Sequence, residues 1–549
     1  MDQSQAKASD RSGSQGSEAL TESLGLPELP LRAPLLPPVA PLPPFLWGVA
    51  TSGYQHEGGV NGVGEPLNNW AWAEREELVE TSGRASNFWE LAEADLERAA
   101  RLGLNAFRLE LSWSRIQPIC TLPDPESGAP PPPFDFSALE RYAAILAHCR
   151  RLGLEPIVTL HHFTHPAWLG LDAWLRTETI DHFVAYVRYA VPQLLELLSE
   201  KHGVLPPRIY LTINEPNMLA ACHYLYGYFP TGPARGAHFL AKVLMHLLEA
   251  HTRIFQVIHE SYKKAPVQPL IGFNNYANNL YWLDQAWIDL LHCPHRGIPK
   301  QKIFSHLWEN ARRFDREFER AQFPTLSPVR RILGNAVKTL QHFLAYAASL
   351  GDSWDRLIDV IYSCPTRPLD YIAFDYYDPF VEHAFRWPHW RDELPRRNKT
   401  FHEWVLEGFT SKWWDWHMLP EGLAFVIQQL RRFGLPLLIA ENGIAYRGHS
   451  SGALEQRADA VRRTDYIRTH VQMVTRLWEE GAPLFGYLYW SLIDNYEWGS
   501  YTPRFGLYSM GVPDSWERKE SGLDGENPAQ TYAEEVACAR QRMSRTKSA

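Results

Sequence analysis

Two glutamates stand at places in the sequence where a carboxyl group can do chemistry. Glu441 closes the apolar run LLIAE and is followed at once by Asn-Gly, a strong turn signal. Glu215 follows the run RIYLTIN, and the proline after it predicts an extended backbone that projects the carboxyl group. Alone, either residue is typical of a solvated loop. Two carboxyl groups facing each other across one pocket can instead divide into an acid and a nucleophile, as glycoside hydrolysis needs.

Other side chains could tune such a pair. Arg108 lies inside the apolar run NAFRLEL, and a buried guanidinium needs an anionic partner. With the hydroxyl of Tyr377, it would keep Glu441 ionised, whereas a neighbouring negative charge and partial burial would help Glu215 to hold its proton. Once Glu441 carries a sugar it is no longer charged, and its repulsion of a negative charge on Glu215 disappears. Glu215 could then lose its proton and serve as a base. Asn214, beside it, has an amide for a substrate hydroxyl.

The elements that must position these residues are short apolar runs alternating with longer amphipathic stretches. Near-continuous apolar runs are typical of parallel strands that are covered on both faces. The amphipathic stretches 88–103 and 136–153 each end in Gly, a usual helix stop. Eight such units predict an α/β fold, and they favour a (β/α)8 TIM barrel with loop insertions at its C-terminal face. An open doubly wound sheet is the less favoured alternative. The predicted strands are 45–51, 105–111, 154–160, 208–214, 269–274, 370–377, 435–441 and 484–490.

Polar residues collect at the ends of these predicted strands, where barrel enzymes place their chemistry. Seven of the eight strands carry them, which indicates a shared site. They are Gln55, His56 and Glu57; Arg108; the segment HHFTHP; Asn214 and Glu215; Asp375, Tyr376 and Tyr377; Glu441; and the segment WSLIDNYEW. The adjacent histidines are more often structural than metal ligands, and we expect no metal. Most of the 21 tryptophans should fill the core, while those at the barrel mouth could pack against a sugar.

Composition excludes several classes of function. A net charge of −9 without a long basic run argues against nucleic-acid binding. The 45% hydrophobic and 21% charged residues describe an ordinary globular chain, and no run of apolar residues is long enough for a membrane span. Six dispersed cysteines without a CxxC pair indicate thiols in a reducing compartment. Because the N-terminus does not resemble a signal peptide, we expect a cytoplasmic protein.

The domain organisation is predicted to be simple. Residues 1–44 are polar and then rich in proline, which predicts a disordered tail, with a PxxP-like partner ligand as the alternative. Residues 45–540 should form one barrel domain. The interval around 275–369 is too long for one crossover and predicts a folded insertion over the barrel mouth. Residues 541–549 are expected to be a disordered tail.

Seven segments, in chain order, resemble those of glycoside hydrolase family 1, the β-glucosidase and β-glycosidase group. They are FLWGVATSGYQHEGG, FRLELSWSRI, TLHHFTHP, TINEPN, DYIAFDYY, IAENG and WSLIDNYEW with a later RFG, and they extend over roughly 45–507. One such motif would be weak evidence, but seven in order are specific. The resemblance implies a retaining, exo-acting β-glycosidase without cofactor or metal, with Glu215 as acid/base and Glu441 as nucleophile.

The resemblance also implies roles for eight further residues. Arg108 and Tyr377 would steady the nucleophile. Trp490 would lie beneath the ring of the non-reducing sugar. Those that would hydrogen-bond that sugar are Gln55, His162, Asn214, Glu497 and Trp498. Hydroxyl contacts that tighten in the transition state lower the barrier of the reaction and not only the free energy of the substrate.

The chain departs from the family pattern at a few positions. Asp375 stands where the family usually has Asn, which adds a negative charge near the predicted pair. Ala440 replaces a common Thr and Gly53 a common Ala, and both look tolerable. The pair Glu497-Trp498 argues against 6-phosphoglycosides, because a carboxylate repels a phosphate.

Three functions fit these observations. The first is hydrolysis of terminal β-glucosyl or β-galactosyl residues. The second is transglycosylation, in which a sugar or lipid hydroxyl intercepts the same intermediate. The third is a catalytically silent glycan-binding protein, which Asp375 would favour and the retention of both glutamates opposes. The sequence specifies no oligomeric state and no identity for the sugar.

Overall fold

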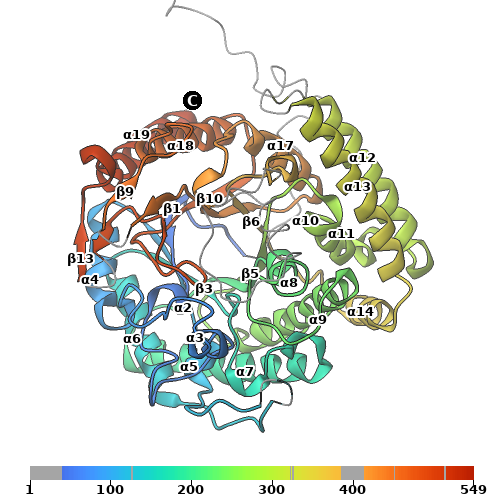
Figure 1. The fold of residues 1–549 in the computed structure, drawn as a ribbon, viewed down its shortest axis with the longest axis horizontal. Coiled ribbons are helices and arrows are strands. Elements are labelled where there is room, and N and C mark those ends of the chain that lie inside the picture. Colours follow the sequence, from blue (N-terminus) through green and yellow to red (C-terminus); the bar gives the residue numbers. More distant parts are fainter. Residues whose placement is uncertain are drawn as a thin grey trace, which may run out of the picture.

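Eight parallel strands close into a barrel, in the order β1-β10-β7-β6-β5-β4-β3-β2, and helices surround them (Figure 1). The strands are β1 Leu46–Ala50, β2 Ala106–Glu110, β3 Glu155–Thr159, β4 Ile209–Asn214, β5 Leu270–Tyr276, β6 Ile372–Tyr376, β7 Leu437–Asn442 and β10 Leu484–Trp490. This computed structural model describes residues 40–124, 126, 128–321, 323, 327–384, 413–449, 452–511 and 515–548. The predicted (β/α)8 barrel and all eight of its strands are confirmed.

Both faces of the barrel strands are buried, which explains their near-continuous apolar sequences. Successive residues of a strand point to opposite faces. Ile157 of β3 and Leu438 of β7 belong to a cluster inside the barrel. Their neighbours Val158 and Ile439 join the much larger core beneath the helices. Apolar side chains on both faces therefore stabilise the strands that carry the site.

The two helices predicted from amphipathic stretches are present. They end at Arg101 and Arg151, and the glycines two residues later, Gly103 and Gly153, have φ of 74° and 78°. That left-handed conformation suits glycine at a helix stop. Among the helices of the described ranges, none has the length and apolar character to cross a bilayer. The α-helices flanking the barrel are α2 Gly53–His56, α3 Ala71–Arg75, α4 Phe88–Arg101, α5 Trp113–Ile116, α6 Phe136–Arg151, α7 Thr177–Glu196, α8 Pro216–Tyr224, α9 Ala237–Ser261, α15 Val381–Ala384, α17 Gly422–Leu430, α18 Arg463–Glu479 and α19 Pro528–Ser548.

The predicted insertion folds as five helices between β5 and β6. In Figure 1, α12 and α13 run along the outer edge of the molecule, beside α10 and α11. Helices α12 and α13 therefore lie at the flank of the barrel, and the covering of the barrel mouth by the insertion stays a prediction. Phe314 and Phe318 of α12 pack edge-on against Phe425 of α17, which holds α12 on the flank of the barrel. The five helices are α10 Tyr281–Asp284, α11 Ala286–His292, α12 Ile303–Arg320, α13 Pro328–Ala348 and α14 Asp352–Ser363.

The structure extends the barrel domain beyond both of its predicted limits, residues 45 and 540. Residues 1–39 of the expected N-terminal tail lie outside the described residues. Ala40 is buried, and Leu42 packs against the cluster inside the barrel, so ordered structure begins before residue 45. The expected C-terminal tail is also wrong, because α19 continues to Ser548. Met543 is buried about two helical turns beyond Val536, so the apolar side of α19 extends past residue 540.

Candidate active site

The carboxyl ends of the barrel strands surround a cavity of about 250 Å³. Eight of the ten predicted site residues line it, and the other two, Arg108 and Asn214, are buried beneath its floor. The structure therefore brings the ten residues together from separate segments of the chain. The eight lining residues are Gln55, His162, Glu215, Tyr377, Glu441, Trp490, Glu497 and Trp498.

Glu441 is held by one cation and one hydroxyl. Arg108 Nη1 donates to Glu441 Oε1 at 2.7 Å, and the Tyr377 hydroxyl donates to Oε2 at 2.8 Å. Burial raises the pKa of Glu441, while the Arg108 charge and the hydrogen bond from Tyr377 oppose that rise. Both carboxylate oxygens are thus fixed in position and bonded in the ionised form, which is what a nucleophile requires.

Arg108 connects Glu441 to two other strands. The guanidinium is fully buried in β2; its Nε donates to Thr159 Oγ1 of β3 at 2.8 Å, and its Nη2 donates to Asn214 Oδ1 of β4 at 2.5 Å. A planar guanidinium with several fixed donors is suited to such a junction. One cation therefore orients the nucleophile and the amide of Asn214 together.

The end of β7 differs slightly from the prediction. The strand includes Asn442, one residue beyond Glu441, and Asn442 pairs with Tyr376 of β6. Gly443 follows without a left-handed φ, so its freedom of conformation is not the reason for glycine there. A Cβ on Gly443 would lie 2.1 Å from the backbone oxygen of Trp490. Glycine at position 443 is thus required by the close approach of the end of β10.

Glu215 adopts a backbone that the sequence did not predict. Its φ is 37° and its ψ is 61°, which is left-handed and not extended. The following proline disfavours a right-handed helical conformation at this position but does not impose an extended one. Because β4 ends at Asn214 and α8 begins at Pro216, Glu215 alone must turn the chain. Strain of this kind in a non-glycine residue is common at functional sites.

Glu215 and Glu441 lie close enough to act on one atom. A carboxylate oxygen of Glu215 lies within 4.8 Å of one from Glu441 and of one from Asp375. Retaining glycosidases place their two carboxyl groups about 5–5.5 Å apart, whereas inverting enzymes leave about 6.5–9.5 Å for a water. Burial raises the pKa of Glu215 well above its usual range, and the charges of Asp375 and Glu441 add to that rise. A raised pKa of this kind is the property that the acid of such a pair requires.

Asp375 and Asn274 complete the floor of the site. Asp375 lies opposite Glu441 in the register of β6 and β7. Asn274 Nδ2 donates to Asp375 Oδ2 and, at 2.6 Å, to Asn214 Oδ1. Asp375 Oδ1 has no hydrogen-bond partner among the described residues. Asn274 was missed because the fifth strand carried no charged residue; the signal was the Asn pair in GFNNY at a strand end.

Two amides fix Glu497 at the inner end of the cavity. Gln55 Nε2 and Asn495 Nδ2 each donate to Glu497 Oε2 at 2.7 Å. The hydroxyl of Ser52 donates to Gln55 Oε1 at 2.7 Å, so that amide has a defined orientation. Burial raises the pKa of Glu497 to about 8. Carboxyl and amide groups arranged in this way can bind several sugar hydroxyls at once.

The two adjacent histidines have different roles. His161 points away from the cavity, where its Nε2 accepts a hydrogen bond from Trp174 Nε1 at 3.2 Å. His162 lines the cavity, stacked with Trp490 at 5.8 Å and with Trp498 at 5.9 Å between ring centroids. Burial lowers the pKa of His162 well below its usual range, so the ring is neutral. The indoles of Trp490 and Trp498 offer flat apolar surfaces beside it.

The outer half of the cavity is apolar and was not predicted from the sequence. Met218 follows Glu215 on α8, Leu280 and Leu283 come from the region of α10, and Val381 begins α15. Their segments carry no chemistry-bearing motif, so only the three-dimensional arrangement identifies them. Further apolar or aromatic residues that line the cavity are Phe163, Ala221, Cys222, Tyr226, Tyr228, Phe229, Tyr276, Phe380, Trp413, Trp416 and Phe505.

Among the residues that the structure describes, two groups of side chains have a composition that could hold a metal. One is Glu215, Asp375 and Glu441, described above. The other is Asp378 at the cavity wall with two histidines, His383 at 2.5 Å and His417 at 3.1 Å. Both oxygens of Asp378 already accept hydrogen bonds from imidazole Nδ1 atoms. The second group is thus a hydrogen-bonded cluster that joins α15 to the segment after residue 412.

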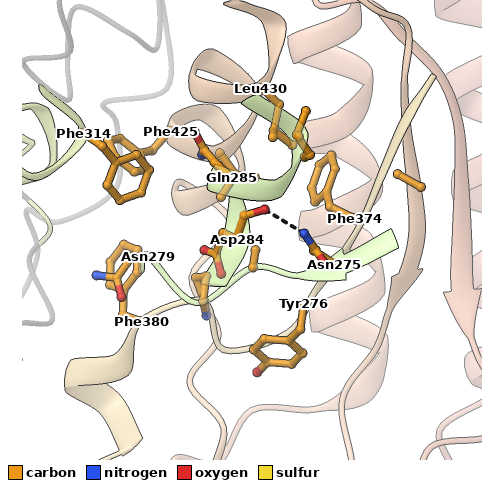
Figure 2. A pocket seen from close by; sticks show the side chains of 15 residues that line it. Asn275, Tyr276, Asn279, Asp284, Gln285, Phe314, Phe374, Phe380, Phe425 and Leu430 are labelled. Atoms are coloured by element: carbon orange, nitrogen blue, oxygen red, sulfur yellow. Dashed lines mark hydrogen bonds between the residues drawn. The ribbon is translucent and has the colours of Figure 1, made fainter. Parts of the chain in front are cut away.

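A second void lies between the ends of β5 and β6 and the helices α10 and α17 (Figure 2). Asn275 Nδ2 donates to the backbone oxygen of Asp284 at 2.7 Å beside it, and Phe374 and Leu430 belong to its lining. Its volume of about 20 Å³ suits one water molecule and no sugar. Tyr276 lines both this void and the large cavity, which remains the candidate site.

The sequence and the fold of this chain are similar to those of known glycosidases. The family model described as glycosyl hydrolase family 1 matches residues 41–283 and 361–522, and the unmatched interval lies within the insertion. A β-galactosidase of Sulfolobus acidocaldarius is 28% identical over 517 residues, which is 85% of this chain and 90% of that protein. A 6-phospho-β-galactosidase of Clostridium acetobutylicum is 23% identical over 479 residues, 84% of this chain and 91% of that protein. The solved structure of a β-glycosidase from Pyrococcus horikoshii is 25% identical, with a TM-score of 0.57, covering 92% of this chain and 96% of that one.

Proposed function

Because the chain belongs to glycosyl hydrolase family 1 and is therefore a glycoside hydrolase, we propose that it is a retaining, exo-acting β-glycosidase. Glu441 is the proposed nucleophile and Glu215 the proposed acid/base, acting on terminal β-glucosyl or β-galactosyl residues. The observation that carries this assignment is the pair of buried carboxyl groups within 4.8 Å, of which one is bonded by a cation and a hydroxyl and the other lies beside a further carboxylate.

In the first step, Glu441 attacks the anomeric carbon from the face opposite the leaving group. The bond between that carbon and the glycosidic oxygen breaks, and Glu215 donates its proton to the departing oxygen. The product is an ester between the sugar and Glu441. In the second step a water attacks the same carbon, Glu215 takes the proton of that water, and Glu441 leaves as a carboxylate. Two inversions retain the configuration of the sugar.

The charge balance of the site supports the change of role at Glu215. Before the first step, the negative charge of Glu441 contributes to the raised pKa of Glu215. The ester carries no charge, so this contribution disappears and the pKa of Glu215 falls. A carboxyl group that was an acid in the first step thereby becomes able to act as a base in the second.

The inner end of the cavity supports binding of an unphosphorylated sugar. Gln55 and Glu497 offer amide and carboxyl groups, and Trp490 offers an indole face. Asn214 lies beneath this surface, where its Nδ2 has no hydrogen-bond partner among the described residues. In its ionised form the carboxylate of Glu497 would repel a phosphate at this end.

A cytoplasmic location is part of the proposal. Its support is the state of the six cysteines, all of which lie in the described ranges and none of which forms a disulfide. Thiols that remain reduced are typical of such a compartment.

The test of the proposed function is covalent labelling. A 2-deoxy-2-fluoro aryl β-glycoside with a good leaving group should inactivate the enzyme and add one glycosyl mass to the peptide that contains Glu441. The fluorine slows both steps, and the activated leaving group restores only the first, so the ester accumulates. The Glu441→Gln variant is the matched control and should remain unlabelled. A label on any other residue would overturn the assignment of the nucleophile.

Asp375 should set the upper pH limit of the reaction. After burial, its charge is the largest cause of the raised pKa of Glu215, so Asp375→Asn should lower that pKa. Glu215 must be protonated in the first step, and a lower pKa means that it loses its proton at lower pH. The basic limb of the profile of kcat/KM against pH is therefore expected to move toward lower pH.

The control for this prediction is a second substrate. A dinitrophenyl glycoside has a leaving group that needs no proton, so its basic limb should stay in place in both proteins. Equal basic limbs for wild type and Asp375→Asn on an unactivated glycoside would show that Asp375 does not act on Glu215.

A further inference from the structure

Helix α13 turns its apolar side outward. Large hydrophobic side chains recur along it at spacings of three, four and seven residues, which places them on one side of the helix. Ile332 is 70% exposed, Phe343 67% and Leu350, just beyond the helix, 71%. The other exposed large hydrophobic residues of the helix are Val329, Leu333, Leu340, Leu344 and Tyr346. Soluble proteins rarely leave such a continuous apolar surface uncovered.

The inward side of α13 is polar and fixes this orientation. Lys338 is buried, and its ammonium group forms an ion pair with Glu382 of α15 at 2.9 Å. Gly334 packs so closely there that a Cβ would lie 2.4 Å from Glu382. On the same helix, His342 Nδ1 accepts a hydrogen bond from Trp282 Nε1 of α10 at 2.9 Å. Rotating α13 to bury its apolar side would break the ion pair and expose these contacts, so the apolar side faces outward stably.

The positive charge of α13 favours a negatively charged partner. From Ser327 to Gly351 the chain contains no Asp or Glu, while Arg330 and Arg331 lie at the start of the helix. This is a cationic segment in a chain with a net charge of −9. An amphipathic helix with apolar, aromatic and arginine side chains fits an anionic lipid surface, in which it lies parallel to the plane. A second copy of α13 would lack acidic side chains on the helix to pair with these arginines.

The candidate active-site cavity lies close to α13. Helix α13 packs against α15 and α10, whose residues Val381 and Leu283 line the apolar outer half of the cavity. If the proposed function holds, a hydrocarbon leaving group would enter through this half. A lipid bilayer bound at α13 would therefore lie next to the apolar outer half of the cavity.

We propose that the outward face of α13, from Val329 to Leu350, docks the protein on an anionic lipid surface without crossing it. The apolar side chains enter the boundary between headgroups and acyl chains, and the two arginines contact anionic headgroups. Because the arginines contribute through charge, binding should weaken as salt concentration rises.

Vesicle sedimentation tests this proposal with the full-length protein. Wild type should sediment with phosphatidylcholine vesicles that contain phosphatidylglycerol, and the Ile332→Glu/Phe343→Glu variant should bind at least about tenfold more weakly. The matched control is Val63→Glu/Leu205→Glu, which changes two hydrophobic residues that are also exposed but lie far from α13 in sequence. The control should bind like wild type. All three proteins should hydrolyse a soluble aryl β-glycoside at similar rates, which reports that they are folded.

Two results would overturn the proposal. One is wild-type protein that fails to sediment with these vesicles, or an α13 variant that binds them as well as wild type. The other is wild type that forms a dimer by analytical ultracentrifugation, does not bind vesicles, and becomes monomeric in the α13 variant. That pattern would assign the surface to a second copy of the chain.

Discussion

Glu441→Gly is expected to lower kcat on an aryl β-glycoside by about 10⁴-fold or more, which corresponds to roughly 5.5 kcal/mol or more of lost transition-state stabilisation. The variant lacks the atom that attacks the anomeric carbon, so no covalent intermediate can form. It also leaves a space on that face of the sugar. Azide should enter this space and attack directly, restoring turnover and yielding an α-glycosyl azide, the product of a single inversion.

The structural cost of this substitution has to be measured separately. Arg108 is fully buried and would lose its carboxylate partner, and an unpaired buried charge can cost about 3–5 kcal/mol of stability. Thermal unfolding followed by circular dichroism should show a lower Tm in a protein that still folds. A Glu441→Gly variant with a native Tm and more than about a hundredth of wild-type kcat would contradict the assignment.

Glu215→Ala should produce an effect that depends on the leaving group. On an unactivated alkyl β-glycoside, kcat/KM is expected to fall about 10²–10⁴-fold, the usual contribution of a general acid. On a dinitrophenyl glycoside, whose leaving group departs without a proton, kcat/KM should change much less. The second step still lacks its base, so the glycosyl ester should accumulate and produce a burst of released dinitrophenol.

Azide distinguishes the two glutamates by the product that it gives. In Glu215→Ala the ester with Glu441 still forms, and azide attacks it from the side of the missing carboxyl group. The product is a β-glycosyl azide, with retained configuration, whereas Glu441→Gly gives the α anomer. Proton NMR of the anomeric position separates the two. If Glu215→Ala gave the α product, or lost activity equally on both substrates, the roles assigned here would be wrong.

The barrel was predictable because its strands are buried on both faces. Runs such as LEPIVTL and LFGYLYW contain few polar residues, and their lengths match the observed strands within two residues at either end. The roles of most of the ten site residues were predicted from the family resemblance, whereas Arg108, Glu215 and Glu441 also stood out for a physical reason. A carboxylate or guanidinium at the end of an apolar run is costly unless it has partners, and Glu441 and Arg108 prove to be each other's partner.

Other features were not predictable because they depend on packing between distant segments. The left-handed backbone of Glu215 follows from the start of α8 immediately after it, and a proline rule alone suggested an extended one. Asn274 carries no charge, so the Asn pair at the end of its run was the only signal and did not specify a contact with Asp375. The direction of the apolar side of α13 depends on the contact of Lys338 with Glu382, and sequence periodicity is the same whether that side is buried or exposed.

The bonds of Arg108 also have a consequence for the order in which the protein is assembled. Thr159 and Asn214 follow it within about a hundred residues, but Glu441 lies 333 residues further along the chain. During synthesis the N-terminal strands emerge first, at a time when the guanidinium has no carboxylate to neutralise it. A half-formed barrel would have to leave this charge in water. Closure of the ring and completion of the catalytic floor are therefore one late event, so folding intermediates should lack hydrolytic activity.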